Sequence, residues 1–168
     1  MKQIVASILA DMVEHEQGQP KHIQHFLKVH AFARYIGQKE QLDEKTLFTL
    51  ELAALVHDIG INPSLAKYHS SAGQYQQIEG PPLARRMLAR YDIANDMIER
   101  VCYLVAHHHT YTQMEGLDYR ILVEADFLVN LYEDQSSVHA IQTALSRYFT
   151  TETGRWLLQT MFLAAPLV

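Results

Sequence analysis

The segment Leu52-Ala53-Ala54-Leu55-Val56-His57-Asp58-Ile59-Gly60 places a histidine and an aspartate directly after an apolar run. The run is expected to lie in the core, so two polar side chains stand at its rim. His57 offers a neutral nitrogen and Asp58 a carboxylate oxygen, which are ligand types of borderline divalent metals such as Zn, Mn and Fe. Adjacent His and Asp also occur by chance, so the pair predicts a metal site only if other segments supply further ligands.

Apolar residues recur at helical spacing through almost the whole chain, and no alternation lasts long enough to predict a strand. Asp43 is expected to cap the helix that leads into this segment, Gly37 to end the helix before it, and Asn95 to cap a later one. The helices are expected at about residues 4–17, 23–36, 43–57, 80–88, 95–108, 118–132, 136–149 and 152–164. The sequence therefore predicts an all-α, single-domain bundle of seven to eight helices over residues 1–168, with a motif-bearing core at 20–132 and C-terminal helices at 136–164 packed on it.

Residues 61–79 interrupt this pattern. They contain Asn62-Pro63-Ser64, Ser70-Ser71-Ala72-Gly73 and a glutamine-rich stretch, without a sustained apolar face. A long loop is expected here, with at most a short helical turn, and loops of this length in compact domains are usually functional or mobile. Gly80-Pro81-Pro82 is expected to open the next helix, because proline is tolerated in a first turn.

The composition limits the classes of partner. The 168 residues are enough for one domain with a real core, and 19 acidic against 14 basic residues give a formal net charge of -5. That balance argues against a nucleic-acid polymer, since a phosphate backbone favours a basic face. Cys102 is the single cysteine, so no internal disulfide can form and a cytoplasmic location is the default expectation. No signal peptide is evident before Asp11, and no apolar run approaches the roughly 18 residues that span a membrane.

Further polar residues fall on apolar helix faces. His25 lies on the core face of the second expected helix, and Asp126 lies in the apolar stretch 122–129, where an unpaired carboxylate would be costly to bury. Taken singly, such residues are more often a packed histidine or an internal cap than metal ligands. Together with His57 and Asp58 they give two nitrogens and two carboxylates from three helices. Such a set leaves coordination positions open, as catalytic metal sites do.

The run His107-His108-His109 ends the fifth expected helix. Consecutive helical residues point about 100° apart, so at most two of the three can face one site. A pair of them could hold a second metal with Asp58 as a bridge, whereas a histidine run at a helix end is otherwise commonly solvated. His22, His30 and His69 are interpreted as surface or supporting residues.

The order of these residues resembles that of the HD superfamily of metal-dependent phosphohydrolases. The resemblance rests on residues 25–29, 55–60, 105–108 and 123–128, and it covers about residues 20–132. It implies an all-α fold and a divalent transition metal (Mn, Fe, Ni, Co or Zn) as cofactor. It also implies that this metal is bound by His25, His57, Asp58 and Asp126, and that His107 and His108 match the pair that serves a second metal in two-metal members.

The sequence departs from the family pattern at two places. Many relatives carry a lysine after the glycine of the tetrad, where it can contact phosphate; here that position is Ile61, and Lys67 and Lys28 are the candidates to take its place. Two-metal relatives also place a histidine a few residues before the glycine near position 80, whereas residues 76–79 hold none and Glu79 would have to serve as a carboxylate ligand. One ion is therefore expected, and a second can be accommodated.

The resemblance and the ligand set predict hydrolysis of a phosphate ester or anhydride of a small, nucleotide-like molecule. Asp58, or Glu79 across the loop, is expected to position the nucleophile. Lys28, Arg85 and Arg86 are the basic residues expected near the phosphate, although at least one of the arginines is expected to lie on a solvated face instead.

Two other functions stay open. Some HD relatives hold a di-iron pair and oxidise C–H or C–P bonds, which requires a complete second metal site. The other alternative is a non-catalytic HD module that senses a nucleotide. The apolar segment 156–163 is expected either to close the core or to pair with a second copy of the chain in a homodimer.

Overall fold

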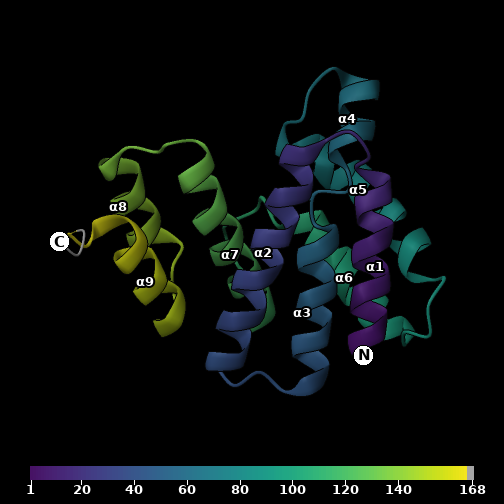
Figure 1. Cartoon of the computed structure of the whole chain (residues 1–168), viewed down its shortest axis with the longest axis horizontal. Helices are drawn as coiled ribbons and strands as arrows, with labels where there is room; N and C mark the ends of the chain where they lie inside the picture. Colours follow the sequence, from purple (N-terminus) through teal and green to yellow (C-terminus); the bar gives the residue numbers. More distant parts are fainter. Residues whose placement is uncertain (166–168) are drawn as a thin grey trace.

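The computed structural model describes residues 1–165, and the chain is helical almost throughout (Figure 1). No strand occurs in these residues, so the prediction of an all-α fold is confirmed. Within the same range, no helix combines the length and the apolar character needed to cross a membrane. The helices are α1 (Lys2–His15), α2 (Pro20–Lys39), α3 (Glu44–Val56), α4 (Ile61–Tyr68), α5 (Gly73–Leu88), α6 (Asn95–His107), α7 (Leu117–Glu133), α8 (Val138–Arg147) and α9 (Glu152–Leu158), which continues into a π-helical segment, η1 (Gln159–Leu163).

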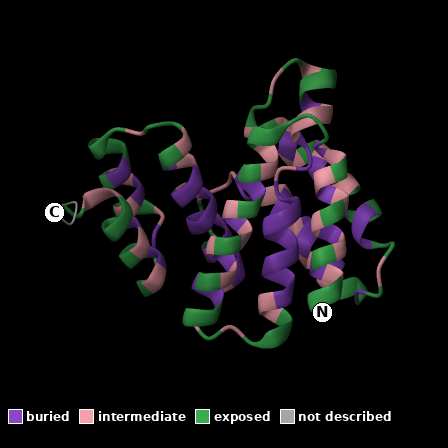
Figure 2. Cartoon of the chain, in the orientation of Figure 1, coloured by how far each residue is buried: buried purple, intermediate pink, exposed green. Residues whose placement is uncertain are grey.

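Helix α3 is buried over most of its length, and Figure 2 shows most of its turns in the colour for buried residues. All residues from 48 to 56 are buried, and they include every face of the helix. A helix of this kind is stable only when neighbours cover each side, and α1, α2, α6 and α7 pack around it. The tetrad 57–60 follows its last turn, so core packing fixes where His57 and Asp58 stand.

The prediction of a long loop at residues 61–79 is wrong. Helix α4 occupies residues 61–68 and α5 already begins at Gly73, so a short connection links them. Helix α4 has about two turns, which is too short for an apolar period to be recognised, and Pro63 is accommodated in its first turn. It ends at His69, whose φ of 54° is left-handed.

Gly80 lies in the middle of α5 and does not open it, contrary to the prediction. Pro81 and Pro82 stand inside the helix, where each removes a backbone donor, and packing along α6 sustains the helix through them. The crossing of α5 over the tetrad is very close. A Cβ on Gly60 would lie 2.7 Å from the carbonyl oxygen of Gln76 and 2.9 Å from the backbone nitrogen of Gly80. This crossing brings the first turns of α5 to the tetrad.

The predicted helix caps are correct at one position of three. Asp43 caps α3, because its carboxylate accepts hydrogen bonds from two backbone N–H groups of the first turn at 3.0 and 3.1 Å. Gly37 does not end α2, which continues to residue 39; it lies where a Cβ would come 2.8 Å from a methyl group of Leu47. Asn95 begins α6 but does not cap it, since Ala94 occupies the cap position.

The C-terminal helices lie beside α7, at the end of the molecule remote from α1 (Figure 1). Glu124 of α7 anchors them: its buried carboxylate accepts hydrogen bonds from the backbone nitrogens of Thr150 and Thr151 at 2.6 and 2.9 Å, and from both hydroxyl groups. Leu158 is fully buried in the core, whereas Trp156 is exposed. The segment 156–163 therefore closes the core through part of its length.

Candidate metal centre

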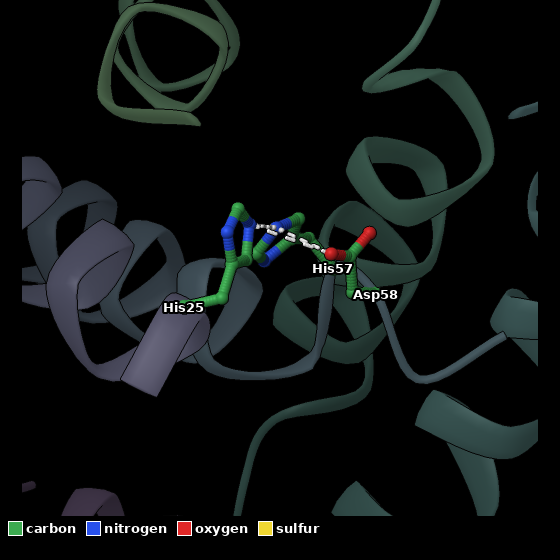
Figure 3. Close-up of side chains that lie close together, drawn as sticks. All are labelled: His25, His57 and Asp58. Atoms are coloured by element: carbon green, nitrogen blue, oxygen red, sulfur yellow. Dashed lines mark hydrogen bonds and ion pairs between the residues drawn. The ribbon is translucent and has the colours of Figure 1, made fainter. Parts of the chain in front are cut away.

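Three helices bring the four predicted ligands together, and Figure 3 shows three of them. His25 comes from α2, His57 and Asp58 follow α3, and Asp126 comes from α7. The Nε2 atoms of His25 and His57 lie 3.3 Å apart. Asp126 Oδ1 lies 3.1 Å from His25 Nε2 and 3.6 Å from His57 Nε2, and Asp58 Oδ2 lies 3.4 Å from each nitrogen.

Three of the four ligand side chains are held in place by a further contact. His57 Nδ1 donates a hydrogen bond to the carbonyl oxygen of Ala54 at 2.9 Å, and His25 Nδ1 lies 3.2 Å from Glu133 Oε2. Such partners fix the ring orientation and leave Nε2 as the atom available to a ligand. Asp126 is held in the same way by an amide, because Asn130 Nδ2 donates to its Oδ1 at 2.8 Å.

The histidines and carboxylates of this cluster shift each other's pKa. Burial alone would lower the pKa of His57, but Asp58 and Asp126 outweigh burial and raise that pKa to about 9. Burial would also lower the pKa of His25, but the hydrogen bond with Asp126 is the main cause of a net rise. Burial would raise the pKa of Asp58 and of Asp126, but the adjacent imidazoles outweigh it and lower both. In the metal-free cluster the carboxylates therefore favour the protonated form of both imidazoles.

The donor set fits a divalent transition metal. His25, His57 and Asp58 each offer a ligand atom, and these atoms all lie within 4.8 Å of one another. Two facing imidazole nitrogens need a proton or a cation between them, because two lone pairs would otherwise repel. A divalent cation can take the place of the protons, and two nitrogens with carboxylate oxygens are ligands that Zn, Mn, Fe, Co and Ni accept.

A second group of ligand atoms shares Asp58. Asp58, His108 and His109 also offer atoms within 4.8 Å of one another, and His108 Nε2 lies 3.5 Å from Asp58 Oδ1. His108 Nδ1 donates to the carbonyl oxygen of Val105 at 2.9 Å. The Nε2 atoms of both histidines are buried and find no hydrogen-bond partner among residues 1–165, which is rare for polar atoms in proteins. These two nitrogens fit ligands of a second cation.

His107 does not belong to this group. Its Nδ1 donates to the carbonyl oxygen of Tyr103 at 2.7 Å, and its ring stacks on that tyrosine with centroids 4.2 Å apart. Because α6 ends at His107, the next residues leave the helical phase and His109 turns toward Asp58. Two of the three histidines reach the site, as expected, but the pair is His108 and His109.

Gln76 lies shortly before Gly80 and lines the same cavity as the ligand cluster. It is buried, and its Nε2 donates to the carbonyl oxygen of Ser71 at 2.7 Å. Its Oε1 is buried without a hydrogen-bond partner. An amide oxygen thus stands on the segment where two-metal relatives carry an imidazole, and carbonyl oxygens favour harder cations than imidazoles do.

A cavity of about 300 Å³ opens beside the ligands. Asp58 and Asp126 reach its surface, and His109 and Gln76 line it next to the second group. Helix α4 provides an apolar wall, to which Ile61 contributes in place of the family's lysine. The cavity therefore joins both groups of ligand atoms to an open space of small-molecule size.

Glu79 lies outside this cavity, contrary to its predicted role. Its carboxylate accepts hydrogen bonds from Lys67 Nζ and from the Tyr68 hydroxyl, both at 2.8 Å. These contacts join α4 to α5, and they lower the pKa of Glu79, with Lys67 as the main cause. Glu79 is therefore a surface ion-pair residue in this structure.

The basic residues predicted to bind phosphate are engaged elsewhere. Lys28 Nζ lies 2.5 Å from Glu133 Oε1, and Arg85 Nη2 donates to Glu99 at 2.7 Å. Neither Lys28 nor Arg85 lines the cavity, and the exposed Arg86 does not line it either. The structure brings none of these three to the ligand cluster.

Lys21 is a cavity residue that the sequence pattern did not identify. It lines the cavity one helical turn before His25 and, in contrast to Lys28, has no ion pair within residues 1–165. The sequence feature that could have identified Lys21 is its position four residues before the ligand His25 on the same helix, because positions i and i+4 share a face.

Comparison with known proteins agrees with this arrangement. The HD domain family profile matches residues 22–146. The chain is similar to a crystal structure described as a predicted HD superfamily hydrolase from an uncultured Thermotogales bacterium, with 26% identity and a TM-score of 0.69 over 94% of this chain and 84% of the other. Curated protein sequences give no match. The match of the family profile includes His25 of α2 and Asp126 of α7. The chain therefore belongs to the HD domain family.

Proposed function

We propose that this protein is a metal-dependent phosphohydrolase that acts on a phosphate ester or anhydride of a small, nucleotide-like molecule. The observation that carries the proposal is the convergence of His25, His57, Asp58 and Asp126 beside an open cavity. The family membership and the similarity to a predicted HD superfamily hydrolase support hydrolysis as the reaction type.

His25, His57, Asp58 and Asp126 would hold the ion beside the cavity, which three of these residues line. A divalent ion bound by them would polarise a phosphoryl oxygen and lower the pKa of water from 15.7 toward about 7. The Asp58 side chain is 21% exposed, against 6% for Asp126 and 0% for His57. Asp58 is thus the ligand residue best placed to accept a hydrogen bond from an attacking water and to orient it.

Lys21 replaces the predicted residues as the phosphate contact. It supplies a positive charge at the cavity and has no acidic partner in the described part of the chain, whereas Lys28 is neutralised by Glu133. The apolar wall formed by Ile61 and Leu65 suits the organic part of the substrate. At about 300 Å³, the cavity is at the small end of ligand pockets, which favours a monophosphate ester over a large dinucleotide.

The experiment is a metal-dependent phosphatase assay with matched variants. The purified protein is stripped of metal, reloaded with Mn, Co, Ni, Fe or Zn, and tested against nucleotides and simple phosphate esters. We expect activity that depends on the added metal, and we expect Asp58→Ala to abolish both activity and metal content. Asp92→Ala, which alters an exposed aspartate, is the control and keeps both. Equal activity in Asp58→Ala would disprove the assignment.

A second candidate function rests on the second group of ligand atoms. Because Asp58 belongs to both groups, two ions could share it as a bridge, which is the arrangement that oxidation by a di-iron pair requires. An iron-loaded protein with two ions per chain, oxygen consumption and no activity toward any phosphate ester would favour this function over hydrolysis.

A further inference from the structure

His22 lines the cavity and is held by a carboxylate. Its Nδ1 lies 2.8 Å from Glu16 Oε2. It stands three residues before His25 on α2, and positions i and i+3 of a helix face the same side. His22 is also the cavity histidine that belongs to neither group of metal-ligand atoms.

Glu16 is placed to orient this ring. It follows the last turn of α1 and is only 2% exposed. The same Oε2 atom accepts a hydrogen bond from Asn62 Nδ2 at 3.0 Å, and Asn62 belongs to the first turn of α4. The buried carboxylate therefore ties the α2 wall of the cavity to the α4 wall, and it restricts the rotation of the His22 ring.

The contact decides which nitrogen of His22 is available for chemistry. Because Nδ1 is taken by the carboxylate, Nε2 is left as the atom that the ring can present to a molecule in the cavity. Among residues 1–165, no hydrogen bond to Nε2 is formed. Carboxylate–histidine pairs that hold a ring in this way are the usual means of positioning a general acid or base.

We propose that His22 is the general acid of the reaction and that Glu16 is its positioning residue. This inference rests on the proposed phosphohydrolase function. The water oxygen forms the new bond to phosphorus, and the bond between phosphorus and the leaving oxygen breaks. His22 Nε2 gives its proton to that oxygen, which departs as an alcohol, and the proton lost by the water returns to His22 through solvent. The products are the alcohol and the phosphate.

The test compares two substrates that differ in their need for a proton. An alkyl phosphate has a poor leaving group, whereas p-nitrophenyl phosphate releases a stable phenolate without protonation. We expect His22→Gln to lower kcat for the alkyl phosphate by about 100-fold or more, which is the usual contribution of general-acid catalysis. For p-nitrophenyl phosphate the loss is expected to stay below about 10-fold. Metal content should not change, since His22 is not a ligand.

His30→Gln is the matched control. His30 also belongs to α2 and also contacts a buried glutamate, with Nε2 3.2 Å from Glu51 Oε1, but it does not line the cavity. We expect this variant to keep the wild-type rates on both substrates. His22→Asn is a second variant of the same residue, and it secures the comparison if the glutamine variant folds poorly.

Glu16→Gln tests the positioning role. It should change the ratio of the two rates in the same direction as His22→Gln, and the double variant should lose little more than His22→Gln alone, because both act through one proton. If His22→Gln lowers kcat equally for both substrates, or for neither, while the wild-type protein is active, the role of His22 is overturned and the proposed function remains intact. A wild-type protein inert toward every phosphate ester would overturn the proposed function, and this inference with it.

Discussion

The metal affinity of this protein is expected to depend steeply on pH. Asp58 and Asp126 outweigh the effect of burial and raise the pKa of His57 to about 9 in the metal-free protein, so this histidine carries a proton at neutral pH. A metal binds only the neutral imidazole and has to displace that proton. Affinity therefore rises with pH until the pKa of His57 is passed, and it falls as the pH is lowered.

The size of the effect follows from the pKa of His57. Below about pH 9, each pH unit changes the apparent dissociation constant about tenfold, which corresponds to about 1.4 kcal/mol. Between pH 6.5 and pH 8.5 we therefore expect Mn²⁺ to bind about 100-fold more tightly at the higher pH. The pKa of His25 is also raised, mainly by its hydrogen bond with Asp126 against the opposing effect of burial, and this acts in the same direction.

The assay is calorimetric titration of the metal-free protein with Mn²⁺ in buffers of different ionisation enthalpy. The dependence of the measured heat on the buffer gives the number of protons released, and we expect at least about one per ion at pH 7. A chelator of known affinity in each buffer calibrates the free metal concentration. An affinity that stays constant from pH 6.5 to 8.5, with no proton release, would refute the proposed protonation of the cluster.

Three further predictions concern single side chains. His108→Ala should reduce the metal content or weaken binding of a second ion, measured by elemental analysis, whereas His107→Ala should leave both unchanged because its ring stacks on Tyr103. Glu124→Gln should lower the free energy of unfolding in urea by about 2 kcal/mol, since the neutral amide keeps one acceptor oxygen for the backbone N–H groups but turns an NH2 group toward the Thr151 hydroxyl that donates to Oε2; no change would mean that this carboxylate does not anchor the C-terminal helices. Gly60→Ala should lower the free energy of unfolding in urea by about 2 kcal/mol or more, and by more than Gly80→Ala does. A Cβ at position 60 meets backbone atoms at 2.7 and 2.9 Å, whereas a Cβ at position 80 meets a methyl group of Val105 that can move. The reverse order would contradict the close crossing of α5.

The metal ligands could be predicted from the sequence because they break an apolar pattern. Asp126 interrupts a run of buried residues on α7, and His57 and Asp58 follow a helix that is buried on every side. A buried polar side chain in such a place requires a hydrogen-bond partner or a bound ion. Because several segments carry such side chains, one shared metal site accounts for all of them.

Residues outside regular helices were harder to predict. His109 faces the site because α6 ends two residues earlier, at His107. Helical periodicity does not predict the direction of a side chain beyond the end of the helix. The short helix α4 offers too few apolar positions for a helical period, so the sequence predicts a loop where the structure has the cavity wall that carries Ile61.

The partners of charged residues also depend on contacts that are distant in sequence. Lys28 pairs with Glu133, 105 residues away, and Arg85 pairs with Glu99 on the next helix. Only the folded chain shows that these bases are neutralised while Lys21 is left at the cavity. Which basic residue can meet a phosphate is therefore decided by tertiary packing and not by local sequence.

The most direct test of the metal centre is anomalous diffraction from crystals grown with Mn²⁺ or Zn²⁺. We predict a peak between His25 Nε2, His57 Nε2, Asp58 and Asp126, with ligand distances of about 2.0–2.3 Å. A second peak, if present, should lie between Asp58, His108 and His109. A fully loaded crystal with no peak among the first four residues, or with its ion held by other side chains, would contradict the central claim.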